Sequence, residues 1–156
     1  MDLKQLYQDI ILEHGKSPRN LGKCEGYSHT AKGYNPLCGD KVHVYLKIGN
    51  KEKVENLTFE GDGCAISLAS ASIMTELVKG RSINDTKEIM SAFLNMIKNT
   101  SEIKSNHLDE DQKTKIMSLS GVKQFPMRVK CATLSWHTLN SAMEEKKKEV
   151  NTEEMN

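Results

Sequence analysis

The sequence has no long apolar run and no excess of charge of either sign. None of its apolar stretches approaches the ~18 residues that mark a membrane-spanning helix, so we expect no membrane span. The 22 basic and 21 acidic residues leave a net charge of +1, which gives no support for nucleic-acid binding. The first residues, Met1-Asp2-Leu3-Lys4-Gln5-Leu6-Tyr7, lack the apolar core of a signal peptide. We therefore expect a cytoplasmic protein.

The chain also lacks internal repeats and any sign of a second domain. Its 156 residues are enough to bury a core without disulfide bonds. In a reducing cytoplasm, its four cysteines are more readily explained as thiols or metal ligands than as disulfides. We predict a single domain over residues 1–143, followed by a charged tail over residues 144–156 that frays.

An alternation of apolar and polar residues over positions 41–48 predicts a strand with one buried face. A turn signal at Gly49-Asn50 and the apolar residues within 54–59 predict an antiparallel return strand. The weakly marked residues 28–34 can supply a third strand. We expect an α+β fold, with a small, about three-stranded antiparallel sheet and helices packed on one side of it.

Apolar residues at three- and four-residue steps predict helices in the rest of the chain. Asp85 with Glu88 resembles a capping box and indicates where one of these helices begins. We expect helices over residues 3–14, 64–79 and 85–97 and from near Cys131 to 143, and a polar surface excursion over residues 99–113.

The four cysteines include no CxxC pair, the usual mark of a structural zinc site. Instead, Cys38, Cys64 and Cys131 lie in three separate segments, each flanked by glycines or by charged residues. With Asp40 they make a candidate set of four metal ligands that folding must bring together. Because one ligand is a carboxylate, the set suggests a site that exchanges ligands as well as holding them.

The expected positions of these thiols favour thiolates. Cys64 and Cys131 fall at expected helix starts, where unpaired N–H groups and positive potential stabilise a thiolate. Arg128 adds positive charge near Cys131, and Asp40 projects to the same side as Cys38 if that segment is extended. A tetrahedral Zn(II) site follows, in which zinc keeps the thiols deprotonated at neutral pH. Its ligands are Cys38, Asp40, Cys64 and Cys131.

Each of these residues also has an ordinary explanation. A single buried cysteine is most often a small apolar residue, and Asp40 taken alone is more readily a turn or cap residue. Arg128 can be an ordinary surface charge. Cys24 lies in a polar loop without a partner at metal spacing and is interpreted as incidental. His43 is the only histidine that we expect to contact the metal ligands and support them without binding the metal itself.

Several longer motifs resemble a known family. The chain is similar to SufU proteins, which belong to the IscU/NifU-N-like family of iron–sulfur cluster assembly proteins. The likeness runs from about the first helix to Trp136, which is nearly the whole chain. It rests on Asn35-Pro36-Leu37-Cys38-Gly39-Asp40, Phe59-Glu60-Gly61-Asp62-Gly63-Cys64-Ala65-Ile66-Ser67, Ser70-Ala71-Ser72-Ile73-Met74 and Phe125-Pro126-Met127-Arg128-Val129-Lys130-Cys131-Ala132-Thr133-Leu134-Ser135-Trp136.

Two departures separate this chain from the scaffold-type IscU proteins that it resembles. Those proteins have a histidine immediately before the third cysteine and a Leu-Pro-Pro-Val-Lys chaperone-binding motif, whereas this chain has Lys130 and a different segment, residues 125–130. The stretch from about Asn99 to Gly121 also matches the extra segment of the SufU branch. Both features favour the SufU branch.

The resemblance implies a zinc-dependent sulfurtransferase in iron–sulfur cluster assembly. It makes Cys38, Asp40, Cys64 and Cys131 the zinc ligands, Cys38 the sulfur acceptor and Arg128 a charged neighbour that assists catalysis. The implied partner is a SufS-type, pyridoxal-phosphate-dependent cysteine desulfurase. A histidine of that partner takes the place of Cys38 on zinc, and the freed thiolate attacks the outer sulfur of a persulfide. Downstream iron–sulfur assembly components then receive the sulfur.

Two alternatives stay open. The same three cysteines and Asp40 can hold iron, so the protein can be a scaffold on which a [2Fe–2S] cluster is assembled. It can also be a zinc-stabilised adaptor that binds and activates the desulfurase without accepting sulfur. Lys130, in place of the histidine, argues against the scaffold.

Overall fold

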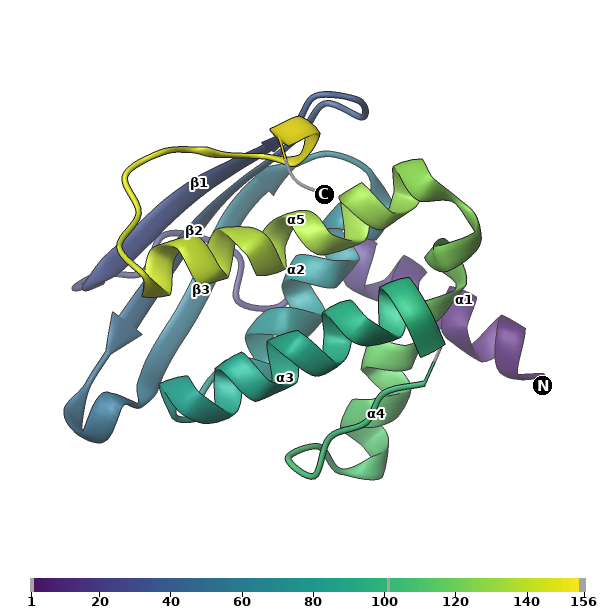
Figure 1. Ribbon diagram of the computed structural model, residues 1–156, viewed down its shortest axis with the longest axis horizontal. Coiled ribbons are helices and arrows are strands. Elements are labelled where there is room, and N and C mark those ends of the chain that lie inside the picture. The colour runs from purple at the N-terminus through teal and green to yellow at the C-terminus, as the bar shows by residue number, and fades with distance from the viewer. Residues whose placement is uncertain (1, 101, 155–156) are drawn as a thin grey trace.

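A computed structural model describes residues 2–100 and 102–154 and has the expected α+β architecture. Its helices lie on one face of a twisted sheet (Figure 1). Among the described residues, no helix combines the length and apolar character needed to cross a bilayer. The helices are α1 (Leu3–Lys16), α2 (Ala65–Val78), α3 (Ile83–Asn95), α4 (Glu110–Met117) and α5 (Pro126–Met143), and the strands are β1 (His29–Asn35), β2 (Asp40–Ile48), β3 (Val54–Asp62) and β4 (Val150–Asn151).

The sheet has four strands in the order β3-β2-β1-β4, one more than expected. β1 confirms the weakly marked strand, and it pairs antiparallel with β2 from His29 opposite Leu46 to Asn35 opposite Asp40. β3 pairs antiparallel with β2, with Val44 opposite Phe59. The extra strand, β4, pairs parallel with β1. Two residues are too few to show an alternating pattern, so the sequence could not indicate this strand.

The expected fraying of the tail is wrong for residues 150–152. After α5 the chain returns along the free edge of β1 (Figure 1), where Val150 lies opposite Gly33 and Asn151 lies opposite Tyr34. Thr152 is buried, with 2% of its surface exposed. The tail is therefore held by backbone pairing and by one buried side chain, neither of which its charged composition reveals. Residues 155–156 of the tail lie outside the described residues.

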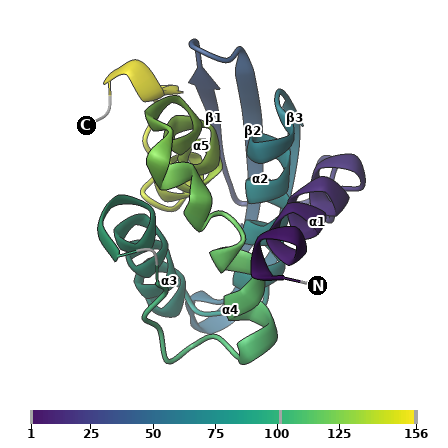
Figure 2. The same ribbon diagram turned by 90° about the vertical axis from the view of Figure 1, so that its right-hand side faces the viewer.

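The core lies between the sheet and helices α2 and α5. Val42, Val44 and Leu46 of β2 face it, as their alternation predicts, and all three are buried. Trp136 of α5 is fully buried and stacks on Phe93 of α3, with 4.5 Å between the ring centroids. α1 packs against α2, at the side of the molecule that faces the viewer in Figure 2.

Helix boundaries differ from the expectation at the start of α3. Ser82, not a box of Asp85 and Glu88, caps this helix, and its side chain accepts a hydrogen bond from the backbone N–H of Asp85. Ser is a strong N-cap because its oxygen pairs an otherwise free N–H group.

The expected surface excursion over residues 99–113 is wrong in part, because α4 begins within it at Glu110. A capping box starts this helix: the side chain of Asp109 accepts from the N–H of Gln112, and the side chain of Gln112 accepts from the N–H of Asp109. The segment has too few apolar residues to show helical periodicity, and polar side chains fix the start of this helix.

α5 begins at Pro126, well before Cys131. Proline is favoured in the first turn of a helix, because the N–H groups of that turn have no acceptor within the helix. The N–H that proline lacks therefore costs no hydrogen bond. Cys131 therefore lies inside the helix and not at its start, which changes the electrostatic argument for its thiol.

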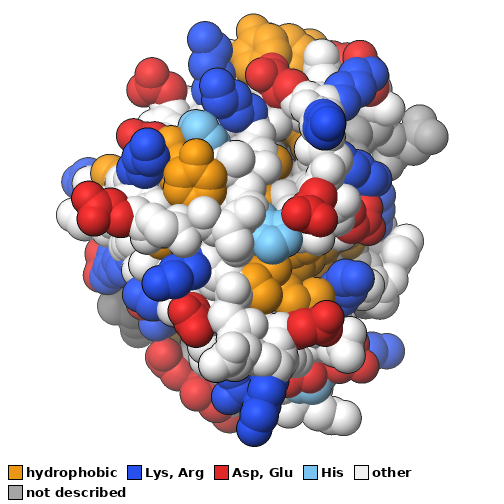
Figure 3. Space-filling model, turned by 90° about the vertical axis from the view of Figure 1, so that its left-hand side faces the viewer, with side chains coloured by type: hydrophobic (Ala, Val, Ile, Leu, Met, Phe, Trp, Pro, Cys, Tyr) orange, Lys and Arg blue, Asp and Glu red, His pale blue; other side chains and the backbone are white. Residues whose placement is uncertain are grey.

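Acidic and basic side chains are intermixed on the face that Figure 3 shows. No large area of one sign stands out there, in keeping with the net charge of +1.

Candidate metal centre

The candidate ligands meet at one end of the sheet. The loop of residues 36–39 joins β1 to β2, and Lys41 at the start of β2 lies opposite Asp62 at the end of β3. α2 follows directly after β3, so its first residues reach the same edge as the loop. The first half of α5 packs beside them and brings Cys131 to the loop (Figure 1).

Three of the four predicted residues form a tight group. The Sγ atoms of Cys38 and Cys131 lie 3.3 Å apart. One ligand atom from each of Cys38, Asp40 and Cys131 lies within 4.8 Å of the other two. Asp40 and Cys131 are fully buried, whereas Cys38 is partly exposed. The loop thiol is thus the member of the group that solvent or a partner can reach.

Cys64 lies at the border of this group. It is the N-cap of α2, as the sequence predicts, and its Sγ accepts a hydrogen bond from the N–H of Ser67 at 3.4 Å. Its own N–H donates to Oδ1 of Asp40 at 2.9 Å. The structure therefore brings all four predicted residues to one place, with Cys64 joined to the other three through Asp40 and, electrostatically, through Cys131.

The carboxylate of Asp40 packs so closely against the backbone of residue 63 that only glycine fits at that position. Gly63 has φ of +151°, and a Cβ atom at this position would overlap the side chain of Asp40. Gly63 therefore permits both the backbone turn into α2 and the close approach of Asp40.

Burial and neighbouring groups shift the pKa values of two of the thiols in opposite directions. The neighbouring thiol of Cys131 foremost, and then the hydrogen bond from the backbone of Ser67, lowers the pKa of Cys64 to about 6. The contact with Cys64, burial and the contact with Cys38 raise the pKa of Cys131. The pKa of Cys64 is therefore shifted toward the thiolate form and that of Cys131 toward the thiol form.

The helix-start argument is confirmed for Cys64 and wrong for Cys131. Cys131 lies in the interior of α5, where its thiol points to the carbonyl oxygen of Met127 at 3.5 Å. Positive charge reaches this group from Arg128 instead. Arg128 is exposed, and the sulfur of Cys131 foremost, then those of Cys64 and Cys38, raises its pKa.

Asn35 is part of the site, although sequence reasoning gave it no role. Its side-chain Nδ2 donates to Oδ2 of Asp40 at 3.0 Å and lies 3.5 Å from Sγ of Cys131. Its Oδ1 accepts a hydrogen bond from the hydroxyl of Thr152 at 2.8 Å. Asn35 opens the motif that contains Cys38 and Asp40, and the register that pairs it with Asp40 is the signal that could have identified it.

His43 does not support the site. Asp40 and His43 are an odd number of residues apart in β2, so their side chains leave opposite faces of the sheet. The two ring nitrogens of His43 are hydrogen-bonded to Thr30 and Tyr45 on the far face. Cys24 is buried beside Asn56, away from the group that contains Cys38.

The donor set fits a zinc ion. A tetrahedral ion with Zn–S bonds of about 2.3 Å holds its sulfur ligands about 3.8 Å apart, and the 3.3 Å between Cys38 and Cys131 needs only a small expansion. The buried carboxylate of Asp40 would supply an oxygen ligand, and Asn35 already holds its second oxygen. Thiolates with one carboxylate form a donor set for a soft or borderline cation.

Exposed apolar side chains flank the group. Leu37 precedes Cys38 and is 50% exposed, while Phe125 and Met127 at the start of α5 are 59% and 54% exposed. Large apolar side chains beside a reactive group are typical of a surface that binds a protein partner.

Sequence comparison finds relatives over nearly the whole chain. The family described as "NifU-like N terminal domain" matches residues 6–149. The zinc-dependent sulfurtransferase SufU of Bacillus subtilis is 38% identical over 142 residues, which cover 91% of this chain and 92% of that protein. The iron–sulfur cluster assembly scaffold protein IscU of Streptococcus pyogenes is 33% identical over 141 residues, covering 90% and 84%.

Solved structures have the same fold. The crystal structure of FiSufU from Fervidobacterium islandicum superposes with a TM-score of 0.76 at 34% identity, covering 89% of this chain and 97% of that chain. The N-terminal part of a NifU-like protein from Brucella abortus superposes with a TM-score of 0.78 over 92% and 97%, and at 23% identity it supports the fold alone.

Proposed function

The chain belongs to the NifU-like N-terminal domain family, which includes SufU- and IscU-type proteins of iron–sulfur cluster assembly, and we propose that it acts there as a zinc-dependent sulfur acceptor. The observation that supports this most is the geometry of Cys38. Its sulfur lies 3.3 Å from that of buried Cys131, yet Cys38 itself is on a loop and partly exposed. Such a thiol can be held as a ligand and can also meet a partner.

Cys38, Asp40, Cys64 and Cys131 would hold the zinc. When bound, zinc keeps the cysteine thiols deprotonated at neutral pH and has no redox chemistry of its own. Among the four, Cys131 is fixed within α5 and Cys64 caps α2. Cys38, next to Gly39 with φ of +73°, is on the most adaptable segment and is the ligand best placed to leave.

The proposed transfer is a thiol–persulfide exchange. The thiolate of Cys38 attacks the outer sulfur of a cysteine persulfide, R–S–SH, and forms a new sulfur–sulfur bond. The bond between the two partner sulfurs breaks, so the products are Cys38–S–SH and the thiolate R–S⁻, with no net oxidation. The rate depends on the fraction of thiolate and on access. Bound zinc would supply the deprotonated thiol, and the position of Cys38 on a partly exposed loop gives access. Arg128, beside the thiols, stabilises the negative charge during this step.

The persulfide donor would be a SufS-type, pyridoxal-phosphate-dependent cysteine desulfurase in the cytoplasm. Leu37 beside Cys38, and Phe125 and Met127 at the start of α5, are exposed and offer an apolar contact for that partner. The sulfur would pass from Cys38 to downstream components of iron–sulfur cluster assembly.

Lys130 weighs against the alternative of a cluster scaffold. By resemblance, scaffold-type proteins have a histidine at this position, where an imidazole can bind iron. Here the side chain of Lys130 is directed to Glu153, with its Nζ 3.0 Å from Oε1. A protonated lysine has no free electron pair for a metal, so the position adds no ligand.

A desulfurase assay tests the proposal against an adaptor role. We expect Cys38→Ala to abolish stimulation of persulfide turnover by the matched desulfurase, while Cys24→Ala, a buried cysteine elsewhere, leaves it unchanged. Full stimulation by Cys38→Ala would instead make the protein an adaptor. Elemental analysis should find about one zinc per chain, whereas a brown protein with visible absorption would support the scaffold.

A further inference from the structure

The C-terminal segment touches the metal centre through one buried side chain. Thr152 is 2% exposed, and its hydroxyl donates to Oδ1 of Asn35 at 2.8 Å. Asn35 is fully buried and has its amide nitrogen 3.0 Å from Oδ2 of Asp40 and 3.5 Å from Sγ of Cys131. A hydrogen-bonded path therefore joins residue 152 to two candidate ligands.

The direction of this path follows from the chemistry of the groups. A carboxylate only accepts hydrogen bonds, so Asn35 must turn its NH₂ group to Asp40 and its carbonyl oxygen the other way. That carbonyl oxygen is buried and needs a donor, which Thr152 supplies. The Thr152 hydroxyl thus holds the Asn35 amide in the one orientation in which its NH₂ group can donate to Asp40.

Two further contacts hold Thr152 in place. The preceding residues form β4 beside Gly33 and Tyr34 in β1, the strand that ends with Asn35. The following residue, Glu153, pairs with Lys130 at 3.0 Å, immediately before Cys131 in α5. The segment therefore bridges the strand that supplies Asn35 and the helix that supplies Cys131.

We propose that residues 150–153 form a clamp on the metal centre, in which Thr152 is a positioning residue for Asp40 and Cys131 through Asn35. This rests on the proposed metal-binding role of those two residues. The clamp makes the affinity and geometry of the site depend on a short segment at the far end of the chain. Glu153 joins the clamp through Lys130, the residue that distinguishes this chain from the scaffold type.

Release of cobalt from the full-length protein tests the clamp. Co²⁺ replaces zinc as a visible probe, and its absorption reports the coordination geometry, while transfer to a chromophoric chelator gives the release rate. Loss of a hydrogen bond that orients a metal ligand typically costs 10- to 100-fold in affinity. Because Thr152 acts through Asn35 and not on a ligand directly, we expect Thr152→Val to release cobalt about tenfold faster, the low end of this range, and to alter its spectrum. Thr152→Ser, which keeps the hydroxyl, should restore both.

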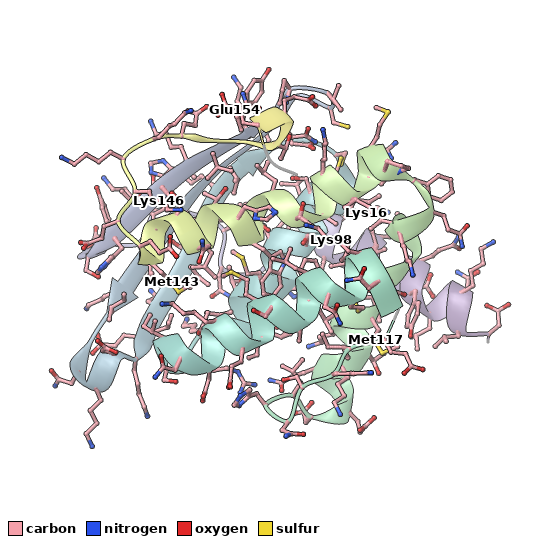
Figure 4. The ribbon with its side chains drawn as sticks, viewed as in Figure 1. Lys16, Lys98, Met117, Met143, Lys146 and Glu154 are labelled. Carbon is pink, nitrogen blue, oxygen red and sulfur yellow. The ribbon has the colours of Figure 1, made fainter. Side chains whose placement is uncertain are left out.

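Glu154→Gln is the matched control. Glu154 lies on the same terminal turn (Figure 4) and pairs with Lys148, not with Lys130. The Glu154→Gln variant should release cobalt at the wild-type rate. The Glu153→Gln variant should release cobalt faster than Glu154→Gln does.

The outcomes separate the clamp from the metal centre itself. Wild-type release and spectrum for Thr152→Val would overturn the clamp and leave the metal centre standing. Equal defects in Thr152→Val and Thr152→Ser would also overturn it, because the hydroxyl would then be irrelevant. If Thr152→Val does not fold by circular dichroism, Glu153→Gln decides: wild-type release overturns the clamp. A wild-type protein that binds no cobalt at the cysteines would overturn the proposed function instead.

Discussion

The Sγ atoms of Cys38 and Cys131 lie 3.3 Å apart although 93 positions separate the two residues in the sequence. One thiol is on a partly exposed loop and the other is buried inside α5. This pairing of a partly exposed loop thiol with a buried helical one, beside the buried carboxylate of Asp40, is the arrangement that the proposed sulfur acceptor needs. It leads to the following predictions.

Replacing Asp40 with alanine should weaken zinc binding and expose a more reactive Cys38. The carboxylate is a candidate ligand, and it also accepts the N–H of Cys64 at 2.9 Å. Its loss removes both interactions, so we expect zinc affinity to fall by at least about tenfold. Competition with a chromophoric chelator measures the affinity, and alkylation of Cys38 measures its reactivity. Asp62→Ala, an exposed carboxylate at the end of β3, is the control. Unchanged affinity in Asp40→Ala would contradict the ligand role.

Gly63→Ala should both destabilise the fold and disturb the site. The added Cβ would overlap Asp40, and φ of +151° is strained for alanine. We expect the free energy of unfolding to fall by about 1–3 kcal/mol, as measured by denaturant titration, together with weaker zinc binding. Gly121→Ala adds a Cβ with no atom within 4 Å and should change stability by less than about 0.5 kcal/mol. Similar effects of the two substitutions would show that Gly63 has no special relation to Asp40.

Arg128→Gln should slow sulfur acceptance by Cys38 at low salt. The guanidinium lies next to the cysteine sulfurs, which raise its pKa. Because Arg128 is exposed, salt screens its field. We expect a few-fold slower single-turnover transfer at low ionic strength, and a difference that shrinks as salt is added. Lys123→Gln, another cation near the start of α5, serves as the control. A defect that does not depend on salt would indicate a structural role for Arg128.

Acid should destabilise the fold through His14. Burial foremost, and then the positive charge of Arg19, lowers the pKa of His14 below the ordinary 6.5. Its Nδ1 bonds Ser72, and Glu76 and Lys115 also face the ring. The unfolded chain therefore binds a proton before the folded one does. Stability is fully present above pH 6.5 and falls as the pH drops below that value.

Denaturant unfolding at several pH values measures this loss for the wild type and for His14→Gln. We expect the variant to lose less stability on acidification than the wild type. Equal losses in the two proteins would contradict the assignment to His14.

The sequence predicted strands β1 to β3 and indicated which cysteines come together, because both leave local signals. The alternation of β2 marks its buried face, and the motifs around Cys38, Cys64 and Cys131 are long enough to indicate a shared site. Fold class and family were confirmed for the same reason.

The parts that were missed depend on contacts between distant residues. Pro126 starts α5 early and places Cys131 inside the helix, where the expected field of a helix start does not act. Asn35 joins the site through a side-chain amide, and Thr152 reaches it across 117 positions of sequence. Such hydrogen bonds have no periodicity that a sequence pattern can display.

Mass spectrometry of sulfur transfer tests the central claim most directly. The wild-type protein, loaded with zinc, is mixed with a matched cysteine desulfurase and cysteine, and peptide masses locate the added sulfur atom. We expect one sulfur atom on Cys38, none on Cys24, and a marked loss of transfer after a chelator removes the metal. Sulfur on another residue, or equal transfer by the metal-free protein, would contradict a zinc-dependent acceptor at Cys38.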